Sequence, residues 1–254
     1  MVRRALARNA AAPALTVISV VIPALNEAAN LPATLGRVRD ALPAAEIIVA
    51  DGGSRDPTVA IARAHGAHIV TTPAGRGVQL AAGAAAARGH LLLFLHADTL
   101  LPPNAGAILA AWFARADVRI GSFRLAFDDG GAFLRACAWC SRFDSVFTRF
   151  GDQGLAVRRE FYAELGGFPA WPLFEDVELL RRARRVTRVW SFPACVTTSA
   201  RRFRAHGPLR QQWRNVRLLL RFLAGASPHA LAADYALSAA ATRATLQTAT
   251  SRKA

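Results

Sequence analysis

The sequence contains very little lysine and cysteine. Lys253 is the single lysine, so nearly all of the 32 basic residues are arginine, against 17 acidic residues. The three cysteines, Cys137, Cys140 and Cys195, are an odd number, which argues against a disulfide framework and for a reducing compartment. Cys137 and Cys140 have the spacing of half a zinc site, but the second pair is absent. We therefore expect free thiols and a cytoplasmic protein.

Long hydrophobic runs are also absent. No segment reaches the roughly 18 apolar residues that a membrane-spanning helix needs. The apolar run at 16–22, "TVISVVI", is short and β-branched and is stopped by Pro23, so it predicts a strand. Residues 1–15, rich in arginine and alanine, are expected to be a mobile extension. The 53% hydrophobic content of the 254 residues is ample for a buried core.

The net charge of +15 implies attraction to phosphates, nucleic acid or an acidic membrane surface. A nucleic-acid-binding protein is therefore one hypothesis, and it predicts an affinity that falls steeply with salt. We give the charge little weight, because abundant arginine beside abundant alanine resembles a compositional habit of a genome. Acidic residues interleaved at the predicted site also argue against this class, so we expect no nucleic-acid partner.

Short apolar runs alternate with alanine-rich helical stretches in the first half of the chain. The predicted strands are 16–22, 46–50, 67–72 and 91–95, and the predicted helices are 28–41, 57–65, 77–88 and 103–114. Nearly continuous apolar strands in a β-α-β-α order predict an α/β fold, with a doubly wound, mostly parallel sheet and helices on both faces. Ligands in such folds bind beyond the carboxyl ends of the strands.

Polar residues follow each of these four strands. Glu27 comes after the first, Asp51 after the second, Arg76 after the third, and His96 and Asp98 after the fourth. In an extended chain, residues two apart point the same way, so His96 and Asp98 are predicted to share one face. We therefore expect an ion or a ligand at this edge of the sheet.

The pattern changes after residue 115. A half-buried strand is predicted at 119–127, an aromatic-rich helix at 131–148, a turn and a strand at 151–159, a helix at 173–185, and two strands in "TRVWSFP" and "VTTSARRF". The helix at 173–185 has acidic residues in its first turn and arginines in its last turn, which suits the helix dipole.

Seven motifs together resemble family 2 glycosyltransferases of the GT-A fold. They are "SVVIPALNE", "ADGGSRDPT", "GRGVQLAAGA", "FLHADT", "GDQGLAVRR", "GGFP" and "PLFEDVELLRRARR", in the order of that family. Within the family the chain looks most similar to the small bacterial branch named rSAM/selenodomain-associated transferase 2. The resemblance covers about residues 16–205, so we expect a GT-A domain there and a C-terminal amphipathic helix and tail at 206–254.

The resemblance implies a donor site for a nucleoside diphosphate sugar, linked to UDP or GDP. Pro23, Glu27 and Asp51 match its base and ribose pocket. Asp98 matches the second acidic position of a D-x-D motif, which binds the Mn²⁺ or Mg²⁺ that bridges the diphosphate. His96 occupies the first acidic position. Two roles are open for it: a metal ligand beside Asp98, or a hydrogen-bond partner of the nucleotide.

The resemblance also implies an acceptor side. Asp176 matches an aspartate that acts as general base, and the adjacent Glu175 diverges from it by about 100° on a helix, so one of the two faces the acceptor. Asp152 and Gln153 belong to the same side. Arg76 is a fixed positive charge able to bind the diphosphate. The implied reaction is metal-dependent and inverting transfer of a sugar to an acceptor hydroxyl.

Two further hypotheses stay open at this stage. A nucleotidyltransferase also binds a metal-bound nucleotide on an α/β sheet, but "PALNE" is not the glycine-rich basic signature that usually follows the first strand there. A non-catalytic nucleotide-sugar binder is the other, and His96 in place of an acidic residue is what raises it.

Residues 207–224 have clean helical spacing. One stripe is apolar and the next is basic; they contain Leu209, Trp213, Val216, Leu220 and Leu223, and Arg210, Arg214, Arg217 and Arg221. Such a helix either lies on an anionic membrane at its inner face, which would suit a lipid-linked acceptor, or packs on the sheet with solvated arginines. Arg201 and Arg202, just before it, are candidates to reach the diphosphate.

Overall fold

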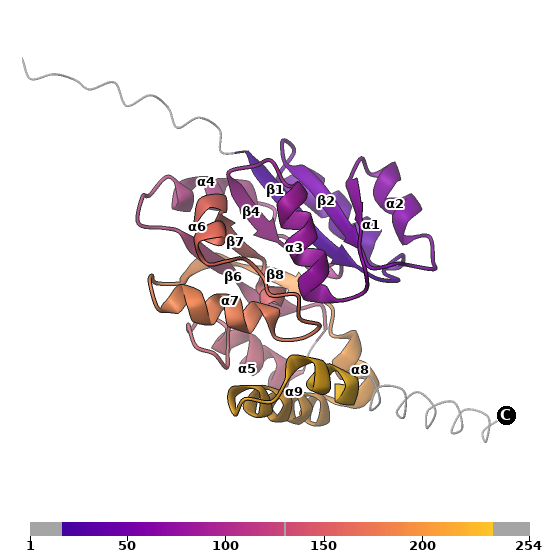
Figure 1. Ribbon diagram of the computed structural model, residues 1–254, viewed down its shortest axis with the longest axis vertical. Helices are drawn as coiled ribbons and strands as arrows, with labels where there is room; N and C mark the ends of the chain where they lie inside the picture. The colour runs from indigo at the N-terminus through magenta and orange to yellow at the C-terminus, as the bar shows by residue number, and fades with distance from the viewer. Residues whose placement is uncertain (1–16, 130, 236–254) are drawn as a thin grey trace, which may run out of the picture.

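The computed structural model describes residues 17–129 and 131–235 (Figure 1). Its centre is an eight-stranded sheet with the order β3-β2-β1-β4-β7-β6-β8-β5. The strands are β1 (Ile18–Ala24), β2 (Glu46–Asp51), β3 (His68–Thr71), β4 (Leu91–Phe94), β5 (Thr99–Leu100), β6 (Ile120–Phe127), β7 (Leu155–Arg158) and β8 (Trp190–Thr198). The predicted extension at 1–15 lies outside the described residues.

The first four strands of the sheet order form a parallel unit. β1 pairs in parallel with β2 and β4, and β2 with β3. β7 is antiparallel to both β4 and β6, β8 is parallel to β6, and β5 is antiparallel to β8. The predicted α/β fold is confirmed, and its parallel character is strongest in the half that carries the predicted nucleotide loops.

Helices cover both faces of the sheet, as predicted. They are α1 (Leu31–Ala41), α2 (Thr58–Ala64), α3 (Arg76–Ala86), α4 (Ala105–Phe113), α5 (Ala132–Cys140), α6 (Arg159–Glu164), α7 (Glu175–Arg184), α8 (Arg201–His206) and α9 (Pro208–Leu223), with a 3₁₀ turn η1 (Gly151–Gln153). Side chains alternate along a strand. Val20 and Ile22 thus enter the core under α1, α2 and α4, and Val21 enters the core under α3, α6 and α7.

β1 runs through Pro23, where the sequence predicted its end. The carbonyl of Ala24 accepts a bond from the Gly52 amide on the β2 side, so the backbone of Pro23 faces the β4 side. β4 pairs with β1 only as far as Val21. The missing N–H of proline therefore costs no ladder bond there, which is the situation in which a strand tolerates it.

Several boundaries in the second half differ from the predictions. The predicted helix at 131–148 ends at Cys140, and the two strands predicted around 190 and 200 are the single strand β8, after which "ARRF" starts helix α8. The short elements β5 and α6 had no periodic signal long enough to predict them. Propensity was overridden here by pairing: β8 lies beside β6 over most of the length of β6.

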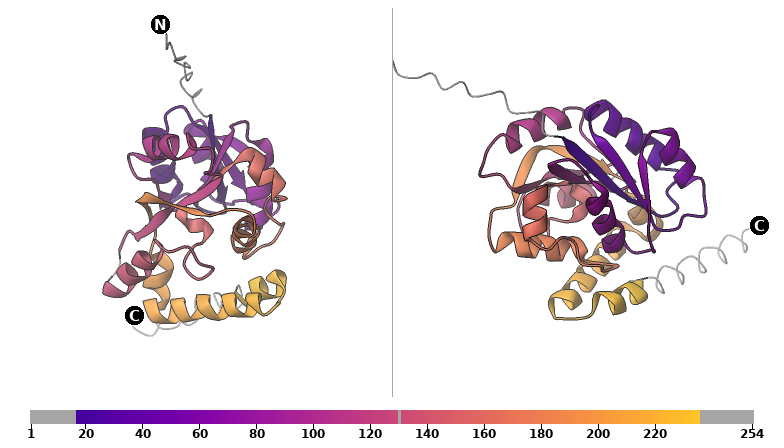
Figure 2. Two further views of the ribbon diagram at one scale, coloured as in Figure 1. Left: turned by 90° about the vertical axis from the view of Figure 1, so that its left-hand side faces the viewer. Right: turned by 45° about the horizontal axis from the view of Figure 1, so that its top comes forward.

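Helix α9 lies at one end of the molecule with α8 (Figures 1 and 2). Its buried side chains Leu218 and Leu219 pack against Phe174 and Val177 at the start of α7. Phe222 also stacks on Phe174, with ring centroids 4.9 Å apart. α9 therefore supports the segment that carries the predicted "ED" pair.

The predicted apolar stripe of α9 is not the face that packs. Leu209 and Trp213 are each 70% exposed, and Leu220 and Leu223 are exposed as well. The alternative in which this stripe packs on the sheet is therefore wrong. No helix in the described ranges is long and apolar enough to cross a membrane.

Candidate active site

The carboxyl ends of β1, β2, β3 and β4 lie at one edge of the sheet, because these strands are parallel. The loops after β1 and β2 are joined there. The Asn26 amide donates to Ser54 Oγ (2.9 Å), and Asn26 Oδ1 accepts from the Arg55 amide (2.8 Å). Asn26 has a φ of 54°, a left-handed conformation that asparagine tolerates. The predicted gathering of polar loops at this edge is confirmed.

Asp51 closes the floor of this edge. Its Oδ2 accepts the amides of Gly53 and Ser54, both at 3.0 Å. Its Oδ1 is buried and has no hydrogen-bond partner within the described residues. An unsatisfied buried acceptor is costly, so a position of this kind calls for a donor supplied from outside the chain. A water or the N–H of a bound ligand can supply it.

Gln79 of α3 holds the two nucleotide loops at a fixed separation. Its Nε2 donates to the carbonyls of Ala24 (2.7 Å) and Ala50 (2.8 Å), at the ends of β1 and β2. Its side chain is buried. This role could not be predicted, since the spacing of a helical glutamine does not reveal a contact with two other elements.

Arg201 of α8 joins two predicted site residues. Its Nη1 and Nη2 donate to Glu27 at 2.9 and 2.5 Å, and Nη2 lies 3.2 Å from Asp98 Oδ2. The forked guanidinium suits this geometry. Burial raises the pKa of Asp98, with Glu27 adding to the rise, and the positive charge of Arg201 opposes it. Arg201 is a predicted candidate for the diphosphate, but its link between Glu27 and Asp98 could not be predicted from the sequence.

His96 and Asp98 lie in a turn rather than in an extended strand. β4 ends at Phe94, and the Thr99 amide donates to the His96 carbonyl at 3.1 Å. The predicted extended conformation of this segment is therefore wrong. Burial lowers the pKa of His96 to about 3, and the positive charge of Arg76 adds to this effect. The imidazole is thus neutral at pH 7, as the predicted role of metal ligand requires.

Arg76 at the start of α3 is bound by the acidic pair at the start of α7. Its Nε and Nη2 donate to the two carboxylate oxygens of Glu175, and its Nη2 lies 3.6 Å from Asp176 Oδ1. The side chain of Glu175 is fully buried, while that of Arg76 is 29% exposed. Glu175 therefore orients Arg76, and its own carboxylate is occupied.

Asp176 is held by two backbone amides. Its Oδ2 accepts from Gly151 at 2.6 Å and its Oδ1 from Val177 at 2.9 Å. Phe174, two residues before Asp176, has a φ of 64°, a strained left-handed conformation for a bulky residue. Such strain persists only where the surroundings fix it, and here the stack on Phe222 does so.

Asp152 is a buried carboxylate of the cluster with a strongly raised pKa. Burial raises its pKa to about 6, the negative charges of Asp176 and Asp98 add to the rise, and Arg76 opposes it. Its Oδ1 is buried without a hydrogen-bond partner within the described residues. A carboxylate with this pKa can take up a proton near neutral pH.

Gln153, predicted beside Asp152, lies away from the cluster. Its side chain is buried, its Nε2 donates to the Thr148 carbonyl at 2.7 Å, and its Oε1 faces Ser122. Pro23 lies half-buried at the end of β1. The structure thus brings together Glu27, Arg76, His96, Asp98, Asp152, Glu175 and Asp176, with Asp51 at the floor of the neighbouring loops.

A divalent cation fits this edge only with help from a ligand. In the described part of the chain, no three histidine, cysteine or acidic side chains are grouped to hold an ion by themselves. Mg²⁺ in phosphate sites is bound by one or two carboxylates together with phosphate oxygens and waters. Asp98 offers one carboxylate. The nearby Asp152 offers a second oxygen, Oδ1, which has no hydrogen-bond partner among the described residues. The donor set suits a hard cation that bridges a diphosphate.

Comparison with known proteins assigns the class. Residues 19–161 match glycosyl transferase family 2, and the chain belongs to this family. Polyprenol monophosphomannose synthase of Mycolicibacterium smegmatis is 39% identical over 116 residues, which cover 41% of this chain and 43% of that protein. An uncharacterized glycosyltransferase of Mycobacterium tuberculosis is 39% identical over 83 residues, 32% of this chain and 36% of that protein. The matches thus span less than half of these curated relatives.

Solved structures share the fold. S. aureus TarS 1-349 superposes with a TM-score of 0.62 at 15% identity, covering 80% of this chain and 65% of that one. Glucosyl-3-phosphoglycerate synthase from Mycobacterium tuberculosis, in complex with Mn²⁺, UDP and glucosyl-3-phosphoglycerate, gives 0.52 at 23% identity, covering 72% and 70%. At these identities the likeness establishes the GT-A fold. The resemblance to family 2 glycosyltransferases is confirmed, and the assignment to the rSAM/selenodomain-associated branch stays a prediction.

Proposed function

We propose that this protein transfers a sugar from a UDP- or GDP-linked donor to an acceptor hydroxyl, with inversion at the anomeric carbon. The observation that carries the proposal is the juxtaposition of Asp98, Arg76 and the Asp152–Asp176 pair at the carboxyl edge of a family 2 fold. The reaction needs a neutralised leaving group, a proton acceptor and an in-line arrangement of the two substrates. This edge contains residues for each need.

The donor side binds and orients the nucleotide. Asp51 Oδ1 accepts an N–H of the base, and Glu27, fixed by Arg201, faces the ribose. Arg76 places a permanent positive charge beside the diphosphate, and Glu175 orients it. Asp98 would hold Mn²⁺ or Mg²⁺, and the bound ion would supply charge neutralisation of the leaving diphosphate. Both neutral roles of His96 are compatible with this arrangement.

The acceptor side removes a proton from the attacking hydroxyl. Asp176 is the candidate given by the family motif, and its position at the start of α7 suits an ionised carboxylate. Asp152 is the second candidate, favoured by its unpartnered oxygen and its pKa of about 6. The two carboxylates interact, since the negative charge of Asp176 adds to the rise in the pKa of Asp152. Glu175 is excluded as the base because Arg76 occupies its carboxylate.

A lipid-linked acceptor at a membrane surface completes the proposal. It is supported by the name of the M. smegmatis relative, which acts on a polyprenol, and by the outward apolar stripe of α9. Arg210 and Arg217 are exposed on the same helix, and arginine side chains beside apolar ones suit an anionic interface. Because α9 packs on Phe174, such a surface lies next to the acceptor side.

Measurements on purified protein test the transfer proposal. Release of UDP from UDP-sugars, and of GDP from GDP-sugars, is compared for wild type, Asp176→Asn and Asp152→Asn. Loss of general-base function lowers turnover by roughly 10²–10⁴-fold and leaves nucleoside diphosphate affinity within a few fold. The variant that loses turnover alone identifies the base. Tight nucleotide binding with no turnover by wild type on any donor would instead support a non-catalytic binder.

Vesicle binding tests the membrane part separately. Wild type is expected to bind anionic vesicles at low salt, and Arg210→Glu with Arg217→Glu is expected to abolish this without unfolding. Arg214 is unsuitable for the test because its guanidinium bonds the Tyr235 carbonyl and stacks on that ring. A wild type that stays in solution beside anionic vesicles would refute the membrane surface and leave the transfer proposal intact.

A further inference from the structure

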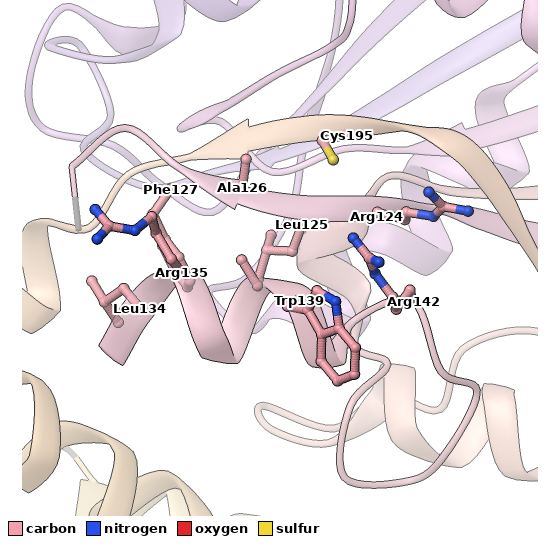
Figure 3. Close-up of a pocket in the computed structure, with 10 residues that line it drawn as sticks. Arg124, Leu125, Ala126, Phe127, Leu134, Arg135, Trp139, Arg142 and Cys195 are labelled. Carbon is pink, nitrogen blue, oxygen red and sulfur yellow. The ribbon is translucent and has the colours of Figure 1, made fainter. Parts of the chain in front are cut away.

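A second concave site lies away from the residues of the active site. It is a cavity of about 300 Å³ between α5 and the strands β6 and β8 (Figure 3). This volume is at the lower end of the range typical of small-molecule sites. On the side of β6 away from β8, pairing with β7 ends at Ser122; α5 approaches the later residues of β6 there, and the Leu125 amide donates to Ser141 Oγ at 2.8 Å. The cavity is thus a consequence of the sheet edge.

The charge of the cavity is one-sided. Arg124 from β6, Arg135 from α5 and Arg142 from the turn after α5 all line it, and none of its lining residues is acidic. Within residues 17–129 and 131–235, neither Arg124 nor Arg142 forms an ion pair, and the buried Nε of Arg124 has no hydrogen-bond partner. Arginine stays protonated at any physiological pH. Arg124 and Arg142 therefore bring positive charge to the site that no acidic group of the described residues pairs with.

The rest of the cavity wall is apolar. Phe127, Leu134 and Trp139 line it, and Trp139 is half exposed and packs edge-to-face on Phe143, with centroids 5.1 Å apart. Phe143 and Phe147, in the loop after α5, are also about half exposed. Exposed aromatic side chains beside a cationic cavity are typical of a surface that meets an amphiphile, because tryptophan favours the boundary between apolar and polar phases.

We propose that the α5 cavity binds an anionic amphiphile, a phosphate head with an apolar chain, drawn from a lipid membrane. The phosphate lies between Arg124 and Arg142, which can each give it two parallel hydrogen bonds. The chain lies along Leu134 and Trp139 toward the exposed aromatic residues. The site takes a lipid headgroup whether or not the transfer reaction is the one proposed above, since it shares no residue with the active site.

Cys195 provides a direct probe of occupancy. It lines the cavity and is exposed, and it sits on β8 opposite Arg124 of β6. In a Cys137→Ala/Cys140→Ala protein it is the single remaining thiol, so its rate of maleimide alkylation reports on the cavity alone. Decyl phosphate below its micellar concentration serves as the soluble probe. Inorganic phosphate supplies the head alone, and decyl maltoside supplies the chain alone.

We expect decyl phosphate to slow alkylation of Cys195 at least fivefold at saturation, and neither control to do so at the same concentration. Arg124→Gln with Arg142→Gln is expected to weaken the decyl phosphate Kd at least tenfold. A control variant, Arg63→Gln with Arg185→Gln, also removes two positive charges, but from exposed positions outside the cavity. It is expected to change the decyl phosphate Kd less than twofold. Circular dichroism verifies that each protein is folded.

A last arm tests the source of the ligand. Vesicles of phosphatidylglycerol are expected to protect Cys195, and vesicles of phosphatidylcholine are not. Protection by decyl phosphate but by neither vesicle would overturn the membrane source. Equal protection by inorganic phosphate, equal protection by decyl maltoside, no protection at all, or equal weakening in the two arginine pairs would each overturn the proposed amphiphile site.

Discussion

Two glutamates in the first turn of α7 form ion pairs of different kinds. One pair joins α7 to another helix, and the others lie within α7 itself. Glu175 is fully buried and binds Arg76 of α3, whose side chain is 29% exposed, across the site. Glu178 binds Arg181 and Arg182 within its own helix, and these side chains are 48% and 31% exposed. Glu175→Gln leaves Arg76 with only the 3.6 Å contact to Asp176. Glu178 is buried too, but Glu178→Gln removes two pairs whose arginines are partly exposed and lie on the same helix.

The expected costs follow from burial. Removing one partner of a fully buried pair costs about 3–5 kcal/mol. Because Arg76 is partly exposed and keeps Asp176, we expect about 2 kcal/mol for Glu175→Gln, or a loss of about 4–8 °C in Tm. Pairs one helical turn apart are worth about 0.3–0.5 kcal/mol each, so Glu178→Gln should cost at most about 1 kcal/mol. Urea unfolding of both variants measures the difference, and equal losses would refute the role of Glu175 as an anchor.

Three further predictions concern the cluster around Asp152 and Arg201. Burial raises the pKa of Asp152 to about 6. If the ionised carboxylate of Asp152 is needed, turnover should fall about tenfold per pH unit below pH 6, and Asp152→Asn should remove this acidic limb of the pH–rate profile. An acidic limb that Asp152→Asn leaves unchanged would belong to another group. The raised pKa also means that folded-state stability falls as pH rises through 6, so Asp152→Asn should raise Tm at pH 8 but not at pH 4, and the opposite order would contradict the burial of this charge. Arg201→Gln should weaken nucleoside diphosphate binding at least fivefold by releasing Glu27 and Asp98. Arg204→Gln, on the same helix α8, breaks only exposed pairs with Asp128 and Asp129 and should not weaken it; calorimetric titration distinguishes the two variants.

The parallel half of the fold could be predicted because its signals are local. Continuous apolar strands, alanine-rich helices and polar residues at strand ends all repeat there, and the structure places each predicted element within three residues of its expected bounds. The end of β1 beyond Pro23 could not be predicted. A strand tolerates proline where its neighbouring strand has already ended, and the sequence of one strand does not show where its neighbour ends.

The rest of the site depends on contacts between distant segments. Arg201 reaches Glu27 across 174 positions, and Arg76 reaches Glu175 across 99. Sequence patterns identified these charged residues but not their pairing, so Glu175 was expected beside Asp176 as a catalytic candidate and is instead bound to Arg76. The outward face of α9 likewise could not be predicted, because Leu218 and Leu219 bury a different stripe from the one that the periodicity selects.

The proposed donor site requires that a nucleoside diphosphate and a divalent cation bind together at Asp98. Thermal unfolding of wild type and Asp98→Asn, each with UDP or GDP and with or without Mn²⁺ or Mg²⁺, tests this directly. A ligand at 100 times its Kd stabilises by about 2.7 kcal/mol, which corresponds to a rise of about 5–11 °C. We predict that wild type gains most of this rise only when nucleotide and metal are both present, and that Asp98→Asn loses the metal-dependent part. An equal response of the two proteins would contradict the assignment of this edge as the donor site.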